Sequence, residues 1–108
     1  MPLHNINQIE EKLLFEGFYG RIIHSKDMTV AYVRAVAGAS LPTHDHPHEQ
    51  IMNLIEGEFI FTVDGVEHHL KAGDIFAIPS NAPHSAKAVT DCRIIDVFNP
   101  PREDWKEA

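Results

Sequence analysis

The sequence predicts an all-β fold, a single antiparallel barrel or sandwich, on two observations. From residue 17 onward, short runs of β-branched and aromatic residues are interrupted every few positions by turn-forming residues. Asp64-Gly65 separates two of these runs and is typical of a two-residue hairpin turn. Roughly eight or more short strands of this kind indicate a jelly-roll barrel, because closure removes most of the exposed strand edges.

The expected elements follow in order along the chain. Residues 5–15 fit either a short helix or an extended arm, since their apolar spacing matches neither period cleanly. Strands are expected at residues 20–24 and 28–36, and residues 38–42 are expected to bend the chain. The remaining expected strands are residues 50–55, 59–63, 66–70, 75–78, 86–89 and 93–98.

The C-terminal third is expected to close with a hairpin and a short tail. Residues 86–89 and 93–98 are expected to pair around Thr90-Asp91. The tail, residues 99–108, begins with Asn99-Pro100-Pro101, which breaks the sheet, and is expected to end in a short turn or helix.

Length and composition predict one soluble domain over residues 1–108. The net charge of −7 argues against a nucleic-acid or anionic membrane partner. The single cysteine, Cys92, cannot form an internal disulfide, which together with the absence of a secretory signal pattern predicts a cytoplasmic protein. No apolar stretch approaches the roughly 20 residues of a membrane helix. A chain this short buries a modest core, so a homodimer is expected.

Three histidines stand at the ends of strand-like runs and predict a metal site. His44 and His46 precede one predicted strand, and His84 follows another beyond the hairpin. Neutral imidazole is a ligand for several divalent transition metals, and the sequence leaves Ni, Zn, Mn and Fe open. Imidazoles converging from separate strands would form an open metal site inside the barrel.

Two segments of the chain resemble the paired motifs of the cupin superfamily. Residues 38–57 and 73–84 each begin with a glycine and carry histidines at the spacing of that family. The matching residues are Gly38, His44, His46, Gln50 and Gly57, followed by Gly73, Pro79 and His84. The resemblance implies a jelly-roll (double-stranded β-helix) barrel with a metal bound by the three histidines and Gln50. Asn81 stands where the family usually has glycine, and asparagine tolerates the positive φ of such a turn.

The identity of the fourth ligand stays open between three neighbouring residues. Strand alternation puts Gln50 and Glu49 on opposite faces, but the apolar residues of this run do not separate the faces cleanly. The family position favours Gln50, and His48 is a further alternative. A neutral amide would leave the site one negative charge short of the usual three-His-one-Glu set, which increases its Lewis acidity.

The C-terminal segment, residues 96–104, resembles the tail of the KdgF-type pectin-degradation cupins, in which an aspartate, a phenylalanine and an arginine line the pocket. The corresponding residues are Asp96, Phe98 and Arg102. The resemblance implies a metal-dependent enzyme that opens 4,5-unsaturated uronates of pectin or alginate breakdown to linear keto forms. Asp96 would be the base or proton shuttle, Arg102 would bind the carboxylate and Phe98 would pack against the sugar.

Other interpretations remain beside this one. The protein could be an iron-dependent dioxygenase, or a cupin that binds a small carboxylate or sugar without turnover. Asp96 could merely hydrogen-bond in the barrel mouth, and Arg102 could pair with Glu103 or another acidic residue of the tail. Cys92 and Trp105 are expected to be structural.

Overall fold

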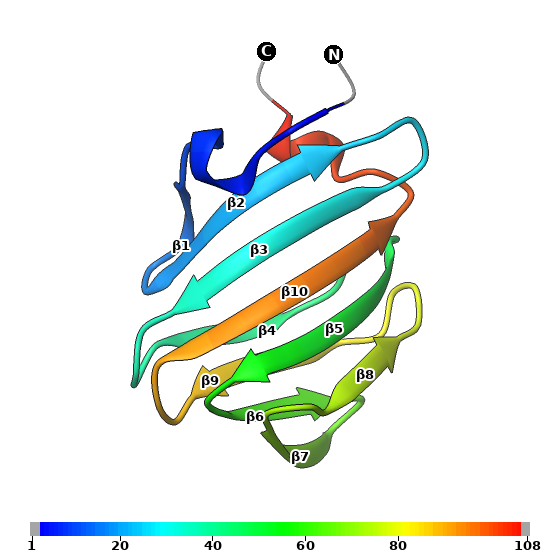
Figure 1. The fold of residues 1–108 in the computed structure, drawn as a ribbon. Coiled ribbons are helices and arrows are strands. Elements are labelled where there is room, and N and C mark those ends of the chain that lie inside the picture. Colours follow the sequence, from blue (N-terminus) through cyan, green and yellow to red (C-terminus); the bar gives the residue numbers. More distant parts are fainter. Residues whose placement is uncertain (1–2, 107–108) are drawn as a thin grey trace.

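The structure, a computed structural model, describes residues 3–106 and confirms the all-β prediction (Figure 1). The part that it describes contains ten strands and two single-turn 3-10 helices, and no helix in that part is long and apolar enough to cross a membrane. In chain order the elements are η1 (Ile6–Gln8), β1 (Lys12–Phe15), β2 (Phe18–His24), β3 (Thr29–Ala35), β4 (Ser40–His44), β5 (Glu49–Glu56), β6 (Glu58–Val63), β7 (Val66–Lys71), β8 (Ile75–Ile78), β9 (His84–Ala88), β10 (Cys92–Asn99) and η2 (Glu103–Trp105).

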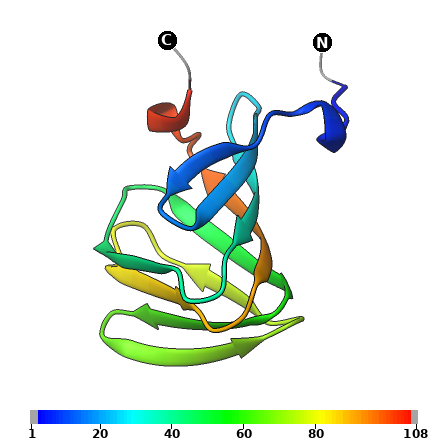
Figure 2. The same ribbon diagram turned by 90° about the vertical axis from the view of Figure 1, so that its left-hand side faces the viewer.

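The strands form two antiparallel sheets that face each other in a jelly-roll arrangement. The larger sheet has the order β1-β2-β3-β10-β5-β8, and the smaller has the order β4-β9-β6-β7. Figures 1 and 2 show how the two sheets are arranged, with η1 and η2 at the same end of the molecule. Alternate side chains of the strands point inward, and the largest buried apolar ones are Phe18, Met52, Leu54, Phe59, Phe61, Ile78, Ile94 and Phe98.

The central hairpin forms as the sequence predicts. β6 and β7 pair along their whole length, and Val63 lies opposite Val66. Asp64 and Gly65 both have positive φ, 49° and 79°, as a type I′ turn requires. The left-handed turn expected at Asn81 is also present, with a φ of 66°.

The bend expected at residues 38–42 is wrong for most of its length, because Ser40–His44 forms strand β4. The bend lies just before this strand, in a turn that Ala39 N closes by donating to Val36 O at 2.9 Å, and Gly38 in that turn has a φ of 87°. β4 lies at the edge of the smaller sheet, where its one partner among residues 3–106 is β9, and its register shifts between Leu41 and His44. An edge strand tolerates Pro42 because one side of its backbone needs no partner, so the proline that suggested a bend does not prevent pairing.

The terminal hairpin expected between residues 86–89 and 93–98 is also wrong. β9 pairs with β4 and β6 in the smaller sheet, whereas β10 lies between β3 and β5 in the larger one. The connection crosses between the sheets and is anchored on both sides. Val89 N donates to Glu58 O at 3.0 Å, and Asp91 Oδ1 accepts from Ala37 N at 2.8 Å. Turn residues predict a reversal of direction, but they do not say which strand is reached.

Residues 5–15 divide between the two structures that the sequence left open. One helical turn, η1, is followed by the extended β1, which pairs only with β2. The segment is tied to the sheet by Arg34, which binds Glu11 at 2.8 Å, and by Arg21 Nε, which donates to Ile9 O at 3.0 Å. β1 therefore covers one end of the space between the sheets.

Candidate metal centre and active site

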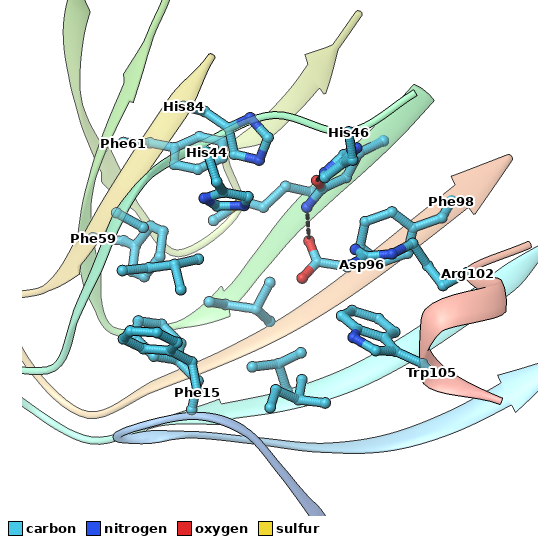
Figure 3. A pocket seen from close by; sticks show the side chains of 18 of the residues that line it. Phe15, His44, His46, Phe59, Phe61, His84, Asp96, Phe98, Arg102 and Trp105 are labelled. Atoms are coloured by element: carbon cyan, nitrogen blue, oxygen red, sulfur yellow. Dashed lines mark hydrogen bonds between the residues drawn. The ribbon is translucent and has the colours of Figure 1, made fainter. Parts of the chain in front are cut away.

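A cavity of about 280 Å³ opens between the two sheets and is lined by both polar and apolar side chains. Figure 3 shows three histidines, Asp96 and Arg102 around one part of it, with Phe15 and Phe59 toward the opposite part. The volume is at the small end of the range for ligand pockets, which limits the ligand to a small molecule.

The two histidine-bearing segments meet at the polar side of the cavity. His44 ends β4 and lies directly opposite His84, the first residue of β9, with ring centroids 4.2 Å apart. His46 follows β4, and its ring lies 4.9 Å from that of His84. Asn81 N donates to His46 O at 2.8 Å and so ties the two segments together. One ring nitrogen from each histidine lies within 4.8 Å of the others.

Each of these three rings is held by a hydrogen bond to a backbone carbonyl. The contacts join Nδ1 of His44 to Pro42 O (2.9 Å), Nδ1 of His46 to His48 O (3.1 Å) and Nδ1 of His84 to Ala82 O (2.8 Å). Because a carbonyl oxygen only accepts, Nδ1 must carry the hydrogen and Nε2 must present a lone pair. Histidines that bind metals almost always donate their second ring nitrogen in this way.

Burial keeps two of the imidazoles neutral. Desolvation, with a smaller contribution from the positive charge of Arg102, lowers the pKa of His46 to about 4. Desolvation also lowers the pKa of His84, and its hydrogen bond to Ala82 opposes this only in part. Protons therefore do not compete with a cation for these nitrogens near neutral pH.

Gln50 faces the histidines from β5. It is buried together with Met52 on the inner face of the strand, whereas Glu49 and Ile51 lie exposed on the outer face. Gln50 Oε1 lies 3.2 Å from His46 Nε2, and Gln50 Nε2 donates to Asp96 Oδ1 at 2.9 Å. The side chain of Glu49 thus points away from the cavity, and His48 is outside the group whose ligand atoms converge.

This donor set fits a divalent transition metal. The ring nitrogens of three imidazoles converge, the amide oxygen of Gln50 lies beside that of His46, and none of the four atoms has a hydrogen to offer another. A cation at that point would satisfy all of them, and nitrogen and neutral oxygen ligands suit the later first-row divalent ions.

Asp96 lies beside this group on β10. Desolvation raises the pKa of its carboxyl to about 6, against the opposing effects of the Gln50 hydrogen bond and the charge of Arg102. A carboxyl group that titrates near neutrality can both accept and return a proton during a reaction.

Arg102 is held on the other side of the cavity by three neighbours. Its guanidinium carbon lies 3.8 Å from the centroid of the Trp105 ring and 4.8 Å from that of Phe98. Its Nε and Nη2 donate to Asp104 at 3.1 and 2.9 Å. The acidic partner is therefore Asp104 rather than Glu103, which pairs with Lys106. A guanidinium has five N–H groups, so the N–H groups of Arg102 that do not bind Asp104 remain for a ligand.

Two features of the site were not predicted from the sequence. Trp105, expected only to pack, also lines the cavity and stacks on Arg102. Leu14 and Phe15 of β1 form part of the apolar wall. The only sequence signal for the stacking of Trp105 on Arg102 is a weak one, an aromatic residue three positions after an arginine. No local signal in the sequence places β1 over the cavity.

Comparisons with known proteins place this geometry in a family. The family model described as "Cupin domain" matches residues 31–98. The pectin degradation protein KdgF of Dickeya dadantii (strain 3937) is 30% identical over 95 residues, which are 85% of this chain and 86% of that protein. The HTH-type transcriptional regulator PuuR of Escherichia coli (strain K12) is 39% identical over 57 residues, 51% of this chain. The match covers 31% of PuuR, so the chain spans less than a third of that regulator.

Solved structures agree over nearly the whole chain. An RmlC-like cupin from Shewanella frigidimarina NCIMB 400 superposes with a TM-score of 0.92 at 31% identity, covering 98% of this chain and 96% of that one. KdgF from Halomonas sp. superposes with a TM-score of 0.86 at 29% identity, covering 93% of this chain and 94% of that one.

Proposed function

The chain belongs to the cupin family, and on that premise we propose that it is a metal-dependent enzyme that acts on a small carboxylate-bearing sugar. The reaction that we propose is ring opening of 4,5-unsaturated uronates to their linear keto forms. The observation that carries the proposal is that one cavity contains the His44, His46, His84 and Gln50 donors together with Asp96 and Arg102. The similarity to KdgF over most of both chains supports it.

The proposed reaction is an isomerisation that needs proton transfer and charge stabilisation. In a 4,5-unsaturated uronate the ring oxygen joins the anomeric carbon to an enol carbon. Loss of the anomeric hydroxyl proton forms the aldehyde as the bond from the anomeric carbon to the ring oxygen breaks, which leaves an enolate. Protonation of the enolate at carbon 4 completes the linear product, which carries an aldehyde and a ketone, so no oxidant or co-reactant is consumed.

Asp96 is the proposed base. Its pKa of about 6 leaves it mostly ionised near neutral pH, yet close enough to neutrality to return the proton. A divalent metal held by the four donors would supply Lewis-acid stabilisation of the negative charge that develops on oxygen.

Arg102 is the proposed anchor for the substrate carboxylate. A planar guanidinium binds a carboxylate through paired N–H groups, and stacking on Trp105 and Phe98 restricts its orientation before the substrate arrives. Phe98 is only 2% exposed, so we propose that it acts chiefly as the platform beneath Arg102 and offers the sugar little surface.

The test is a metal-reconstitution assay. Protein stripped with a chelator is reloaded separately with Ni, Zn, Mn or Fe and given unsaturated galacturonate, and loss of the enol-ether absorbance is followed. We expect reloaded protein to accelerate the loss well above the rate of stripped protein and of buffer. Equal rates in all three samples would refute the proposed activity.

A second candidate is ligand binding without turnover, which the similarity to part of the regulator PuuR favours. Calorimetric binding of a uronate with no product after long incubation would support this candidate. Oxygen consumption that appears only with iron would instead support a dioxygenase.

We also propose a homodimer in the cytoplasm. Three large apolar or aromatic residues are exposed on the outer face of the larger sheet, with exposed fractions of 42% for Tyr32, 43% for Ile51 and 68% for Ile75. Contact of these side chains with water is unfavourable. A second copy would cover this face. Light scattering that gives the mass of one chain over a wide concentration range would refute the dimer.

A further inference from the structure

We propose that Asp96 is a positioning residue for the metal centre, because its hydrogen bond with Gln50 turns the amide oxygen of Gln50 toward the histidines. The same contact accounts for glutamine rather than glutamate at position 50. The inference rests on the metal site of the proposed function, but not on the identity of the substrate or of the reaction.

Strand pairing brings the two side chains together. Gln50 on β5 pairs with Phe98 on β10, and Met52 pairs with Asp96, so Gln50 and Asp96 are diagonal neighbours on the inner face of the larger sheet. Gln50 Nε2 lies 2.9 Å from Asp96 Oδ1, and Figure 3 shows this contact at the edge of the histidine group.

The direction of the amide follows from the chemistry of its partners. An ionised carboxylate only accepts, so Asp96 must face the NH₂ group of Gln50. The amide is planar, and its oxygen therefore points the other way, to within 3.2 Å of His46 Nε2.

His46 cannot donate to that oxygen, because its hydrogen is on Nδ1 and bonded to the carbonyl of His48. Two acceptors thus face each other at 3.2 Å, a separation close to the ~3 Å expected between neighbouring ligand atoms that each lie about 2.1 Å from one ion. Without Asp96, the amide of Gln50 could reverse and donate to His46 Nε2, which would block a metal ligand instead of adding one.

Glutamate at position 50 would conflict with this arrangement. It would place a second carboxylate at hydrogen-bonding distance from Asp96, and the two negative charges would repel each other. Glutamine lets Asp96 keep its charge while an uncharged oxygen faces the metal position. The pair therefore sets both the direction of the fourth ligand and the net charge of the centre.

The test measures metal affinity rather than turnover. Zn²⁺ and Ni²⁺ dissociation constants are obtained by competition with a chromophoric chelator for wild type, Asp96→Ala and Asp96→Asn at mildly alkaline pH. We expect Asp96→Ala to weaken binding by about tenfold or more, the usual effect of removing a partner that orients a metal ligand. Asp96→Asn should stay within about threefold of wild type, because its amide oxygen can still accept from Gln50.

A double-mutant cycle tests the account of glutamine at position 50. Gln50→Glu alone keeps two carboxylates in contact, whereas Gln50→Glu with Asp96→Asn restores a donor and an acceptor in reversed order. We expect the double variant to bind metal at least about tenfold more tightly than Gln50→Glu alone. Glu49→Ala is the matched control, because Glu49 is the exposed neighbour on the outer face and its removal should leave affinity unchanged.

The outcomes separate this inference from the proposed function. If wild type binds metal normally, three results would overturn the positioning role alone. These are an unchanged affinity in Asp96→Ala, equal losses of affinity in Asp96→Ala and Asp96→Asn, and additive effects of the two substitutions in the double-mutant cycle. Wild-type protein that binds no divalent ion would overturn both. Circular dichroism and thermal melting of each variant show that an affinity change does not come from unfolding, and Asp96→Asn preserves the shape of the side chain if Asp96→Ala does not fold.

Discussion

His44 and His84 lie directly opposite each other across the β4–β9 ladder, with their rings 4.2 Å apart. The pair joins the two histidine-bearing segments through ordinary strand pairing, so the backbone fixes the separation of the rings before any ion binds. His46 then needs to approach from one side only, and its hydrogen bond to the carbonyl of His48 sets its direction.

We expect His84→Ala to lower the affinity for Zn²⁺ or Ni²⁺ by at least about tenfold, because one of the converging nitrogens is lost. Metal content per chain after dialysis, measured by mass spectrometry, checks this. His69→Ala is the control, since the His69 side chain is 72% exposed and pairs with Glu67 far from the cluster. Equal metal content in both variants would rule out His84 as a ligand.

We expect Asp104→Asn to raise the KM for an unsaturated uronate by about threefold to tenfold with little change in kcat. The carboxylate of Asp104 holds the orientation of Arg102, and an ion pair with a partly exposed carboxylate of this kind corresponds to about 1 kcal/mol. Steady-state kinetics separate the two parameters.

Glu103→Gln is the matched control, because Glu103 pairs with Lys106 and not with Arg102. An unchanged KM in Asp104→Asn would show that Arg102 needs no support from Asp104. A parallel loss of kcat would point instead to a contact made only in the transition state.

We expect ligand binding to change the fluorescence of Trp105, which is the single tryptophan of the chain. Its ring lines the cavity and lies against the Arg102 guanidinium, so a carboxylate bound to Arg102 alters its surroundings. Titration with a substrate or product should give a saturable change in emission. A flat titration under conditions where calorimetry detects binding would place the ligand elsewhere.

We expect Cys92 to react slowly with iodoacetamide in the folded protein and rapidly in urea. Burial is the main reason that the pKa of its thiol is raised, and its hydrogen bonds to Glu58 and Thr90 do not offset this. The unfolded chain loses the thiol proton above a pH of about 8.5, whereas the folded chain retains it to higher pH. Stability should therefore fall as the pH rises above that value. Alkylation at equal rates in both states would contradict this prediction.

The sequence predicted the elements whose cause is local. The hairpin of β6 and β7 follows from Asp64-Gly65 and the alternation beside it. The convergence of the three histidines depends instead on the long-range pairing of β4 with β9, and the resemblance to the cupin motifs is what predicted it. The pairing of β9 and β10 was missed because two strands joined by a tight turn can belong to different sheets.

The sequence also did not decide which face of β5 points into the cavity, again because the answer depends on the other sheet. Ile51 and Ile55 are apolar yet lie on the outer face, so the hydrophobic pattern of the strand does not distinguish inside from outside. Only the second sheet decides which face is covered, and with it the inward position of Gln50. The contact of Arg102 with Asp104 and Trp105 depends on a single helical turn that sequence spacing alone does not specify.

The family match covers only part of the cavity wall. The histidines, Gln50 and Asp96 lie within residues 31–98, whereas Phe15 and Trp105 belong to the flanking segments. Substitutions at these flanking positions would therefore reshape the cavity wall while leaving the histidine group in place.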